Sequence, residues 1–140
     1  DKAALIQSHT TSNASSISQK AAVMALESGN NFIEEIISTL EIKRNRATSI
    51  LNSIEGVQCP QPSGAFYLFP SIKKFLGSKN GRTIIKSSYE MAEYLLNKKN
   101  VAVVPGTTFG DDESIRISFA TDIDSIEKGC LRIKEGLELL

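Results

Sequence analysis

Residues 101–110 read VAVVPGTTFG and residues 114–120 read SIRISFA, and these two stretches decide the fold. Two short apolar runs flank a Pro/Gly turn and a small acidic loop, a pattern that predicts two strands and their connection. In the second run Ile115, Ile117 and Phe119 alternate with polar residues. Side chains point alternately to the two faces of a strand, so this spacing predicts Arg116 on the face opposite the three apolar residues.

Arg116 has two interpretations. An arginine on the polar face of a half-buried strand is usually solvated, and the spacing alone favours that. The alternative is that its planar guanidinium binds a carboxylate through two parallel hydrogen bonds, which a lysine cannot reproduce. The residue pattern by itself leaves both open.

Length and charge limit the classes of protein to consider. The chain has 140 residues, enough for one domain with a genuine core, predicted to span 1–140. Its 16 basic and 16 acidic residues balance, which removes the electrostatic signature of a nucleic-acid binder. No apolar run is long enough to cross a membrane, and the N-terminus does not read as a signal peptide. Because the chain begins at Asp1 without a methionine, we expect a piece of a longer polypeptide.

The small number of cysteine and histidine residues argues against a metal site. Cys59, Cys130 and His9 are the only cysteines and histidine, and metal sites usually need more ligands at closer spacing. Cys130 falls on the apolar stripe of a predicted helix, where it would act as a small hydrophobe. Two such cysteines favour a reducing, cytoplasmic setting.

The first third of the chain predicts helices. Hydroxyl-rich residues 9–13 precede a helix that runs to about Ser28, with Ser12 or Asn13 as its N-cap and Gly29 at its stop. We interpret the polar run as capping chemistry, with an anion site at the helix N-terminus as the alternative. A second helix begins at Asn30 or Asn31 and continues for about 23 residues, roughly 35 Å.

The remaining segments alternate between strands and helices. The sequence predicts a short strand at 57–59, a central strand covered on both faces at 64–70, and a polar surface excursion at 71–83. A helix is predicted at 88–98, with its apolar side chains facing inward at Met91, Ala92, Leu95 and Leu96. A final helix, capped by residues 121–124, carries an apolar stripe formed by Ile126, Cys130, Ile133 and Leu137. The sum indicates an α+β fold, with helices packed on a small mixed or mainly antiparallel sheet.

Four stretches together resemble one enzyme family. They are TTSNA at 10–14, PSGAFY at 62–67, VAVVPGTTFG at 101–110 and IRISFA at 115–120. In this order and at these separations they resemble the C-terminal part, the small domain, of class I pyridoxal-phosphate-dependent aminotransferases, specifically the aspartate aminotransferase branch common in bacteria. The resemblance implies the small-domain fold of the fold-type I transferases, with one long linking helix.

The resemblance also implies roles for residues. Arg116 matches the arginine that binds the α-carboxylate of the amino-acid donor and of the oxo-acid acceptor, so the carboxylate interpretation now outweighs the solvated one. Phe66 matches a position near the substrate side of the small domain. Residues around Ser12 and Asn13 are similar to a segment near the subunit interface.

Other parts of the family's machinery have no match in this chain. The family uses a Schiff-base lysine in a Ser/Ala-Lys motif followed by Gly-x-Arg-x-Gly, an aspartate on the pyridinium nitrogen and a phosphate-binding loop. Lys2 lacks that context, and the motif is expected upstream of Asp1. The resemblance thus implies no catalytic and no cofactor-binding residue here, pyridoxal 5'-phosphate only in the full-length parent, a missing N-terminal large domain and a homodimeric parent. The fragment alone is expected to be inactive.

Several functions stay open at this stage. The leading hypothesis is a parent that exchanges an amino group between aspartate and 2-oxoglutarate by a ping-pong mechanism, and a related branch acts on prephenate or aromatic amino acids. A second class is a stand-alone α+β module that binds a small acid through Arg116, or regulates by sensing it. A third is a purely structural domain, for which Arg116→Ala would change only solubility.

Overall fold

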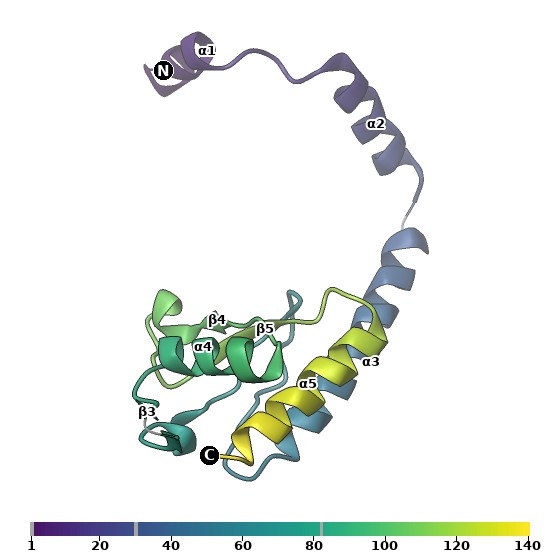
Figure 1. Ribbon diagram of the computed structural model, residues 1–140. Helices are drawn as coiled ribbons and strands as arrows, with labels where there is room; N and C mark the ends of the chain where they lie inside the picture. Colours follow the sequence, from purple (N-terminus) through teal and green to yellow (C-terminus); the bar gives the residue numbers. More distant parts are fainter. Residues whose placement is uncertain (1, 30, 82) are drawn as a thin grey trace. The chain divides into compact units, whose positions relative to one another are not determined.

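The computed structural model describes residues 2–29, 31–81 and 83–140. The helices are α1 (Lys2–Thr10), α2 (Ser16–Glu27), α3 (Asn31–Asn52), α4 (Ser88–Lys99) and α5 (Ile123–Leu137), with the 3-10 turns η1 (Lys73–Phe75) and η2 (Gly106–Phe109) (Figure 1). The strands are β1 (Tyr67–Leu68), β2 (Lys79–Asn80), β3 (Thr83–Ile84), β4 (Val104–Pro105) and β5 (Ile115–Ser118). Backbone contacts divide the chain into two compact units, Asp1–Ile36 and Ile37–Leu140. A single domain over 1–140 stays a prediction.

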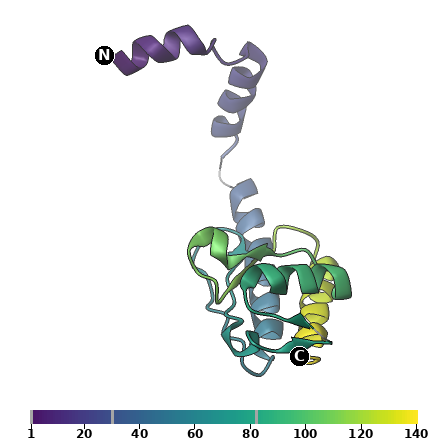
Figure 2. The ribbon, with the colours of Figure 1, turned by 60° about the vertical axis from the view of Figure 1, so that its left-hand side comes forward.

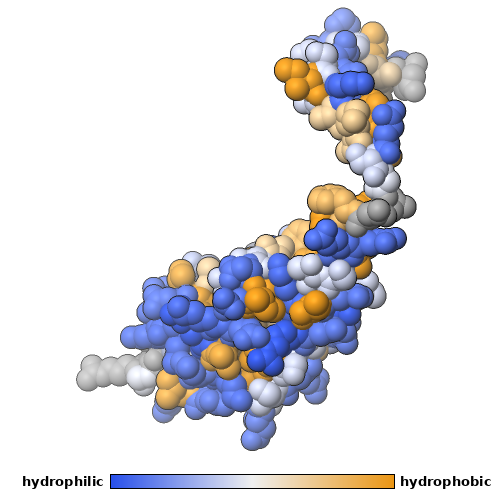
Figure 3. Space-filling model, turned by 90° about the vertical axis from the view of Figure 1, so that its right-hand side faces the viewer, coloured by the Kyte–Doolittle hydropathy of each residue, from blue (hydrophilic) through white to orange (hydrophobic). Residues whose placement is uncertain are grey.

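In the first unit, α1 and α2 bury none of their residues. Their apolar side chains, among them Leu5, Ile17 and Leu26, are exposed, and apolar surface of this unit is visible in Figure 3. Burial of apolar side chains is the main source of helix stability in proteins, so these helices lack that support within the described residues.

The start of α2 differs from the prediction. Its N-cap is Ser15, whose side chain makes no capping hydrogen bond, so Ser12 and Asn13 were wrong as caps. Neighbouring hydroxyls serve the preceding helix instead, since the Thr11 Oγ1 donates to the Gln7 carbonyl at 3.0 Å. Gly29, with φ of 79°, takes the left-handed conformation that ends a helix, as predicted.

The long helix is confirmed as α3, which has 22 residues; the alternative start at Asn30 lies outside the described residues. Its C-terminal part enters the core through Ala47, Ile50 and Leu51. Helix α5 lies alongside this part of α3 in both views (Figures 1 and 2). Arg46 and Glu127 join the two helices by an ion pair of 2.6 Å.

The sheet of the second unit is antiparallel, with the order β1–β5–β4. Its central strand is therefore β5, and residues 64–70 contribute only the short edge strand β1, contrary to the prediction. Ala65 accounts for the late start of β1, because its φ of 59° breaks the extended backbone two residues before Tyr67. The 101–104 run is likewise shorter than predicted, since only Val104 joins the sheet, opposite Arg116.

Two further segments correct the predictions. Residues 57–59 form no strand of their own: Gln58 makes a single bridge to Ser71. Residues 71–83 are more than a surface excursion, because Ile72 and Phe75 are buried and β2 pairs with β3 as a hairpin. Apolar residues spaced among lysines thus anchor this segment to the core.

The core lies between α3, α4, α5 and the sheet. The stripe predicted for the final helix is confirmed, since Ile126, Cys130, Ile133 and Leu137 are all buried. In α4, Met91 and Leu95 are buried as predicted, but Leu96 is 51% exposed and Tyr94 is buried in its place. The Tyr94 hydroxyl donates to the Gly136 carbonyl at 2.9 Å, which satisfies its polar atom within the core.

Cys59 and Cys130 are both buried and free, as expected for small hydrophobes. Burial raises the pKa of each thiol to about 11, so both stay protonated at neutral pH. Among the described residues no group of His, Cys, Asp or Glu side chains could hold a metal ion. Within the same residues, no helix combines the length and apolarity that a membrane span requires.

Candidate functional site

The guanidinium of Arg116 lies over two aromatic rings. Its guanidinium carbon is 4.4 Å from the ring centroid of Tyr67 and 4.4 Å from that of Phe109. Tyr67 comes from the neighbouring strand β1, and Phe109 is the last residue of η2. A guanidinium over an aromatic face is attracted by the ring electrons, and two such rings fix the plane of the group.

Within the described residues the guanidinium of Arg116 makes no hydrogen bond and no ion pair, and its ring contacts are with Tyr67 and Phe109. Arg116 itself is half-buried. Contact with aromatic rings uses none of the N–H groups of a guanidinium in a conventional hydrogen bond. The two rings therefore hold a side chain whose donors are available to an anionic group.

The two rings belong to a longer aromatic row. Phe66 contacts Tyr67 with a centroid distance of 4.5 Å, and Phe69 meets Phe109 edge-on at 6.0 Å. Phe66 is 40% exposed, so it borders the site through Tyr67 without closing it. The structure thus brings both predicted site residues, Arg116 and Phe66, into one aromatic cluster.

The turn that carries Phe109 is tightly packed. Gly106 is buried and its N–H donates to the Ser114 carbonyl at 2.9 Å. Asp111 accepts from the Ser114 hydroxyl at 2.6 Å and from the Glu113 N–H at 2.9 Å, and these bonds lower the pKa of its carboxyl. The turn and the loop after it therefore form one hydrogen-bonded unit beside Arg116.

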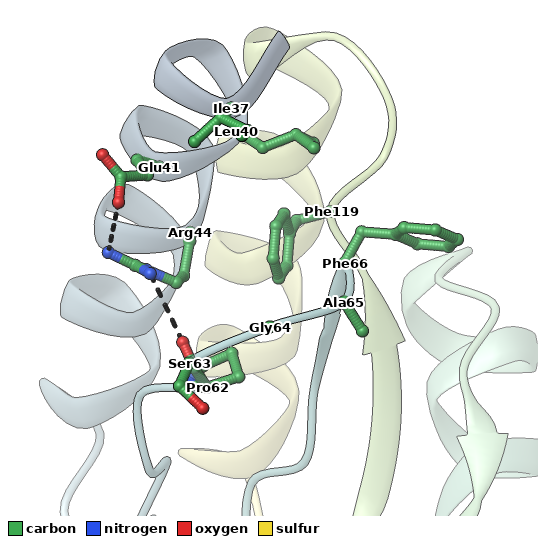
Figure 4. A pocket seen from close by; sticks show the side chains of 10 residues that line it. All are labelled: Ile37, Leu40, Glu41, Arg44, Pro62, Ser63, Gly64, Ala65, Phe66 and Phe119. Carbon is green, nitrogen blue, oxygen red and sulfur yellow. Dashed lines mark hydrogen bonds and ion pairs between the residues drawn. The ribbon is translucent and has the colours of Figure 1, made fainter. Parts of the chain in front are cut away.

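A separate cavity of about 370 Å³ lies between α3 and the loop at 62–66 (Figure 4). Arg44 lies on its α3 side, 3.7 Å from Glu41 and donating to the Pro62 carbonyl at 3.3 Å. The ring of Phe66 points away from the space between Arg44 and Phe119 in this view. Arg116 does not line this cavity, so the two arginines occupy different surroundings.

The sequence prediction missed the partners of Arg116. Tyr67 and Phe109 lie in quoted motifs, but no spacing rule indicates that residues 42 positions apart stack on one arginine. The sequence pattern likewise gave no indication that Arg44 lines a cavity. Ser12 and Asn13 are exposed residues of the first unit, between α1 and α2.

The fold and this arrangement define an α+β domain with an aromatic-flanked arginine on the central strand of its antiparallel sheet. Comparison with protein families narrows the class of protein. The family model described as "Aminotransferase class I and II" matches residues 1–133. The chain belongs to the class I and II aminotransferases, as the resemblance predicted.

Similar proteins narrow the branch. The chain is 43% identical over 137 residues to a probable aspartate/prephenate aminotransferase of Rickettsia conorii, and 41% identical over 136 residues to a bifunctional aspartate aminotransferase and glutamate/aspartate-prephenate aminotransferase of Petunia hybrida. These matches cover 97% and 94% of this chain, but 34% and 28% of the relatives. The chain thus spans about one third of the length of the curated relatives it matches.

Solved structures agree with the fold. An aspartate aminotransferase from Rhizobium meliloti superposes with a TM-score of 0.92 at 37% identity, over 96% of this chain and 34% of that one. An aromatic aminotransferase from Pyrococcus horikoshii matches with a TM-score of 0.66 at 30% identity, over 76% of this chain and 26% of that one. The small-domain fold predicted from the resemblance is confirmed.

This family depends on pyridoxal phosphate. Its covalent attachment needs a lysine in a protected site. The buried polar and charged residues in the described part of the chain are Thr48, Ser88 and Ser114, so no lysine is buried there. The described residues therefore offer no buried lysine to which the cofactor could attach.

Proposed function

We propose that this chain is the C-terminal substrate-clamping domain of an aspartate aminotransferase, in which Arg116 binds the α-carboxylate of the amino acid and of the oxo acid. The observation that carries this proposal is the guanidinium that lies over Tyr67 and Phe109 with its donors unused in the described residues. Family membership supplies the kind of substrate, because aminotransferases act on amino and oxo acids.

The geometry suits orientation of a carboxylate. Two parallel hydrogen bonds from a guanidinium fix both the position and the plane of the carboxylate, whereas an ammonium group fixes only the distance. The rings limit rotation of Arg116, so less conformational entropy is lost when the substrate binds. A substrate held in this way presents its Cα in one orientation, which is the contribution of positioning to the rate.

The substrate pair we propose is aspartate and 2-oxoglutarate, exchanged by a ping-pong mechanism in the full-length parent. Prephenate or an aromatic amino acid is the alternative, supported by the names of the Rickettsia and Petunia relatives. We further propose that a large domain outside this chain holds pyridoxal 5'-phosphate, that the parent is a cytoplasmic homodimer, and that the 140-residue chain alone does not transaminate.

The decisive experiment replaces Arg116 in the full-length polypeptide. Arg116→Lys keeps the positive charge but loses the two parallel N–H donors of the guanidinium, so the KM for aspartate should rise strongly. Arg116→Ala should cost about 3–5 kcal/mol of substrate binding, because the substrate carboxylate is then left buried and unpaired. Arg44→Lys is the matched control, since Arg44 is also half-buried but lies on the other cavity. Equal KM values for Arg116→Lys and the unaltered enzyme would refute the proposal.

A second measurement addresses the cofactor. Borohydride reduction of the full-length polypeptide with pyridoxal phosphate should fix the cofactor to a lysine outside residues 1–140. The 140-residue chain treated in the same way should show no such specific attachment. A stand-alone acid-binding module predicts instead that aspartate binds to the 140-residue chain through Arg116 without any cofactor.

A further inference from the structure

A buried hydroxyl at the start of α4 connects that helix to the turn carrying Phe109. Ser88 has no exposed surface. Its Oγ accepts a hydrogen bond from the Thr107 N–H at 3.1 Å and donates one to Asp112 Oδ1 at 2.7 Å. The same Asp112 oxygen accepts from the Ser88 N–H at 2.9 Å. One buried side chain thus holds both η2 and the loop that follows it.

These bonds act on the site through a short stretch of backbone. Thr107 is two residues before Phe109, and the Phe109 ring is one of the two rings that contact the Arg116 guanidinium. The turn is also held by the Gly106–Ser114 hydrogen bond, and the loop after it by the Asp111–Ser114 hydrogen bond. Phe109 itself is 49% exposed, so burial alone does not hold its ring in place.

We infer that Ser88 and Asp112 are positioning residues that keep Phe109 stacked on Arg116 and thereby set the affinity for the substrate carboxylate. The effect on affinity rests on the proposed function of Arg116; the effect on the stack does not. Without the Ser88 hydroxyl, the Thr107 N–H loses its partner and η2 loses this hydrogen bond to α4. The ring then no longer restricts Arg116, and the fork of donors loses its pre-orientation.

Four variants of the full-length polypeptide separate this role from general stability. Ser88→Ala removes the hydrogen bond to Thr107 and the hydroxyl bond to Asp112, and Asp112→Ala removes both bonds from Ser88 to the loop after η2. Asp112→Asn keeps the Oδ1 acceptor that both Ser88–Asp112 hydrogen bonds use. Ser87→Ala is the matched control, because Ser87 caps the same helix through the Glu90 N–H without a bond to η2. All three alanine variants destabilise α4, but only two release the turn.

We expect Ser88→Ala and Asp112→Ala to raise the KM for aspartate about tenfold while kcat changes little, since they weaken binding more than chemistry. Asp112→Asn and Ser87→Ala should stay within about twofold of the unaltered enzyme. A rise in KM for Ser87→Ala equal to that for Ser88→Ala would overturn the inference, because a general loss of stability would then explain both.

A crystal structure of full-length Ser88→Ala gives a readout independent of activity. The expected result is a Phe109 ring displaced from Arg116, and a ring that keeps its 4.4 Å stack would overturn the inference whatever the kinetics. The carboxylate role of Arg116 and the positioning role of Ser88 and Asp112 can be refuted independently of each other. An unchanged KM in Arg116→Lys refutes the carboxylate role, while the displaced or retained ring still decides whether Ser88 and Asp112 position it.

Discussion

Gly106 leaves no room for a side chain in the turn beside Arg116. A Cβ placed on it would lie 2.2 Å from the Ser114 carbonyl oxygen and 2.3 Å from that of Asp111, both of them backbone atoms. We therefore predict that Gly106→Ala lowers the free energy of unfolding by about 1–3 kcal/mol, the usual cost of overpacking. Urea denaturation followed by circular dichroism measures this change.

Gly129 provides the control for that prediction. It lies within α5, and a Cβ there meets no atom within 4 Å. Because alanine favours a helix over glycine, Gly129→Ala should raise the free energy of unfolding by up to about 1 kcal/mol. Equal effects of the two substitutions would show that close packing around Gly106 is not what constrains the turn.

At the residue scale, sequence reasoning found the arginine but not its surroundings. Strand alternation placed Arg116 opposite the apolar face, and the motif resemblance supplied its role as a hypothesis. Ser88 was predicted only as the start of a helix, because a hydroxyl at that position is compatible with a simple cap. Its bonds to Thr107 and Asp112 depend on tertiary packing between segments about 20 residues apart, which no local pattern encodes.

Two adjacent leucines in α4 test the packing of that element. Leu95 has no exposed surface and belongs to the core, whereas Leu96 is 51% exposed. We predict that Leu95→Ala lowers the free energy of unfolding by about 2–5 kcal/mol, since it leaves a cavity. Leu96→Ala, the same change one residue along the same helix, should cost well under about 1 kcal/mol. Similar losses measured by urea denaturation would contradict the observed orientation of α4.

At the element scale, helices were predicted better than strands for a physical reason. The stripe of α5 recurs at helical spacing and defines a face without tertiary information. In α4 both Leu95 and Leu96 fit a broad apolar face, and only the position of Tyr94 in the core decides which of them is buried. The run at 64–70 is apolar throughout, so its composition did not reveal that Ala65 interrupts the extended backbone before β1.

At the scale of the whole molecule, the two units differ in how their apolar residues are used. Buried residues from α3, α4, α5 and the sheet form the core of the second unit. In the first unit, α1 and α2 have 9 and 12 residues and bury none of them. Helices of this length are marginal in water without packing, so we propose that Ile17, Met24 and Leu26 pack against parts of the parent outside this chain.

Amide hydrogen exchange tests that proposal directly. In the 140-residue chain, we predict that the amides of α1 and α2 exchange at nearly unprotected rates, while those of Leu51, Leu95 and Ile115 in the core are protected. In the full-length polypeptide the amides of α2 should gain strong protection, because its apolar side chains then leave water. Leu131 is the control, because its side chain is exposed although it lies on the well-packed helix α5. Its amide should exchange slowly in both the 140-residue chain and the full-length polypeptide, since exposure of a side chain alone does not remove amide protection. Protected α2 amides in the 140-residue chain would mean that this helix needs no partner beyond residues 1–140.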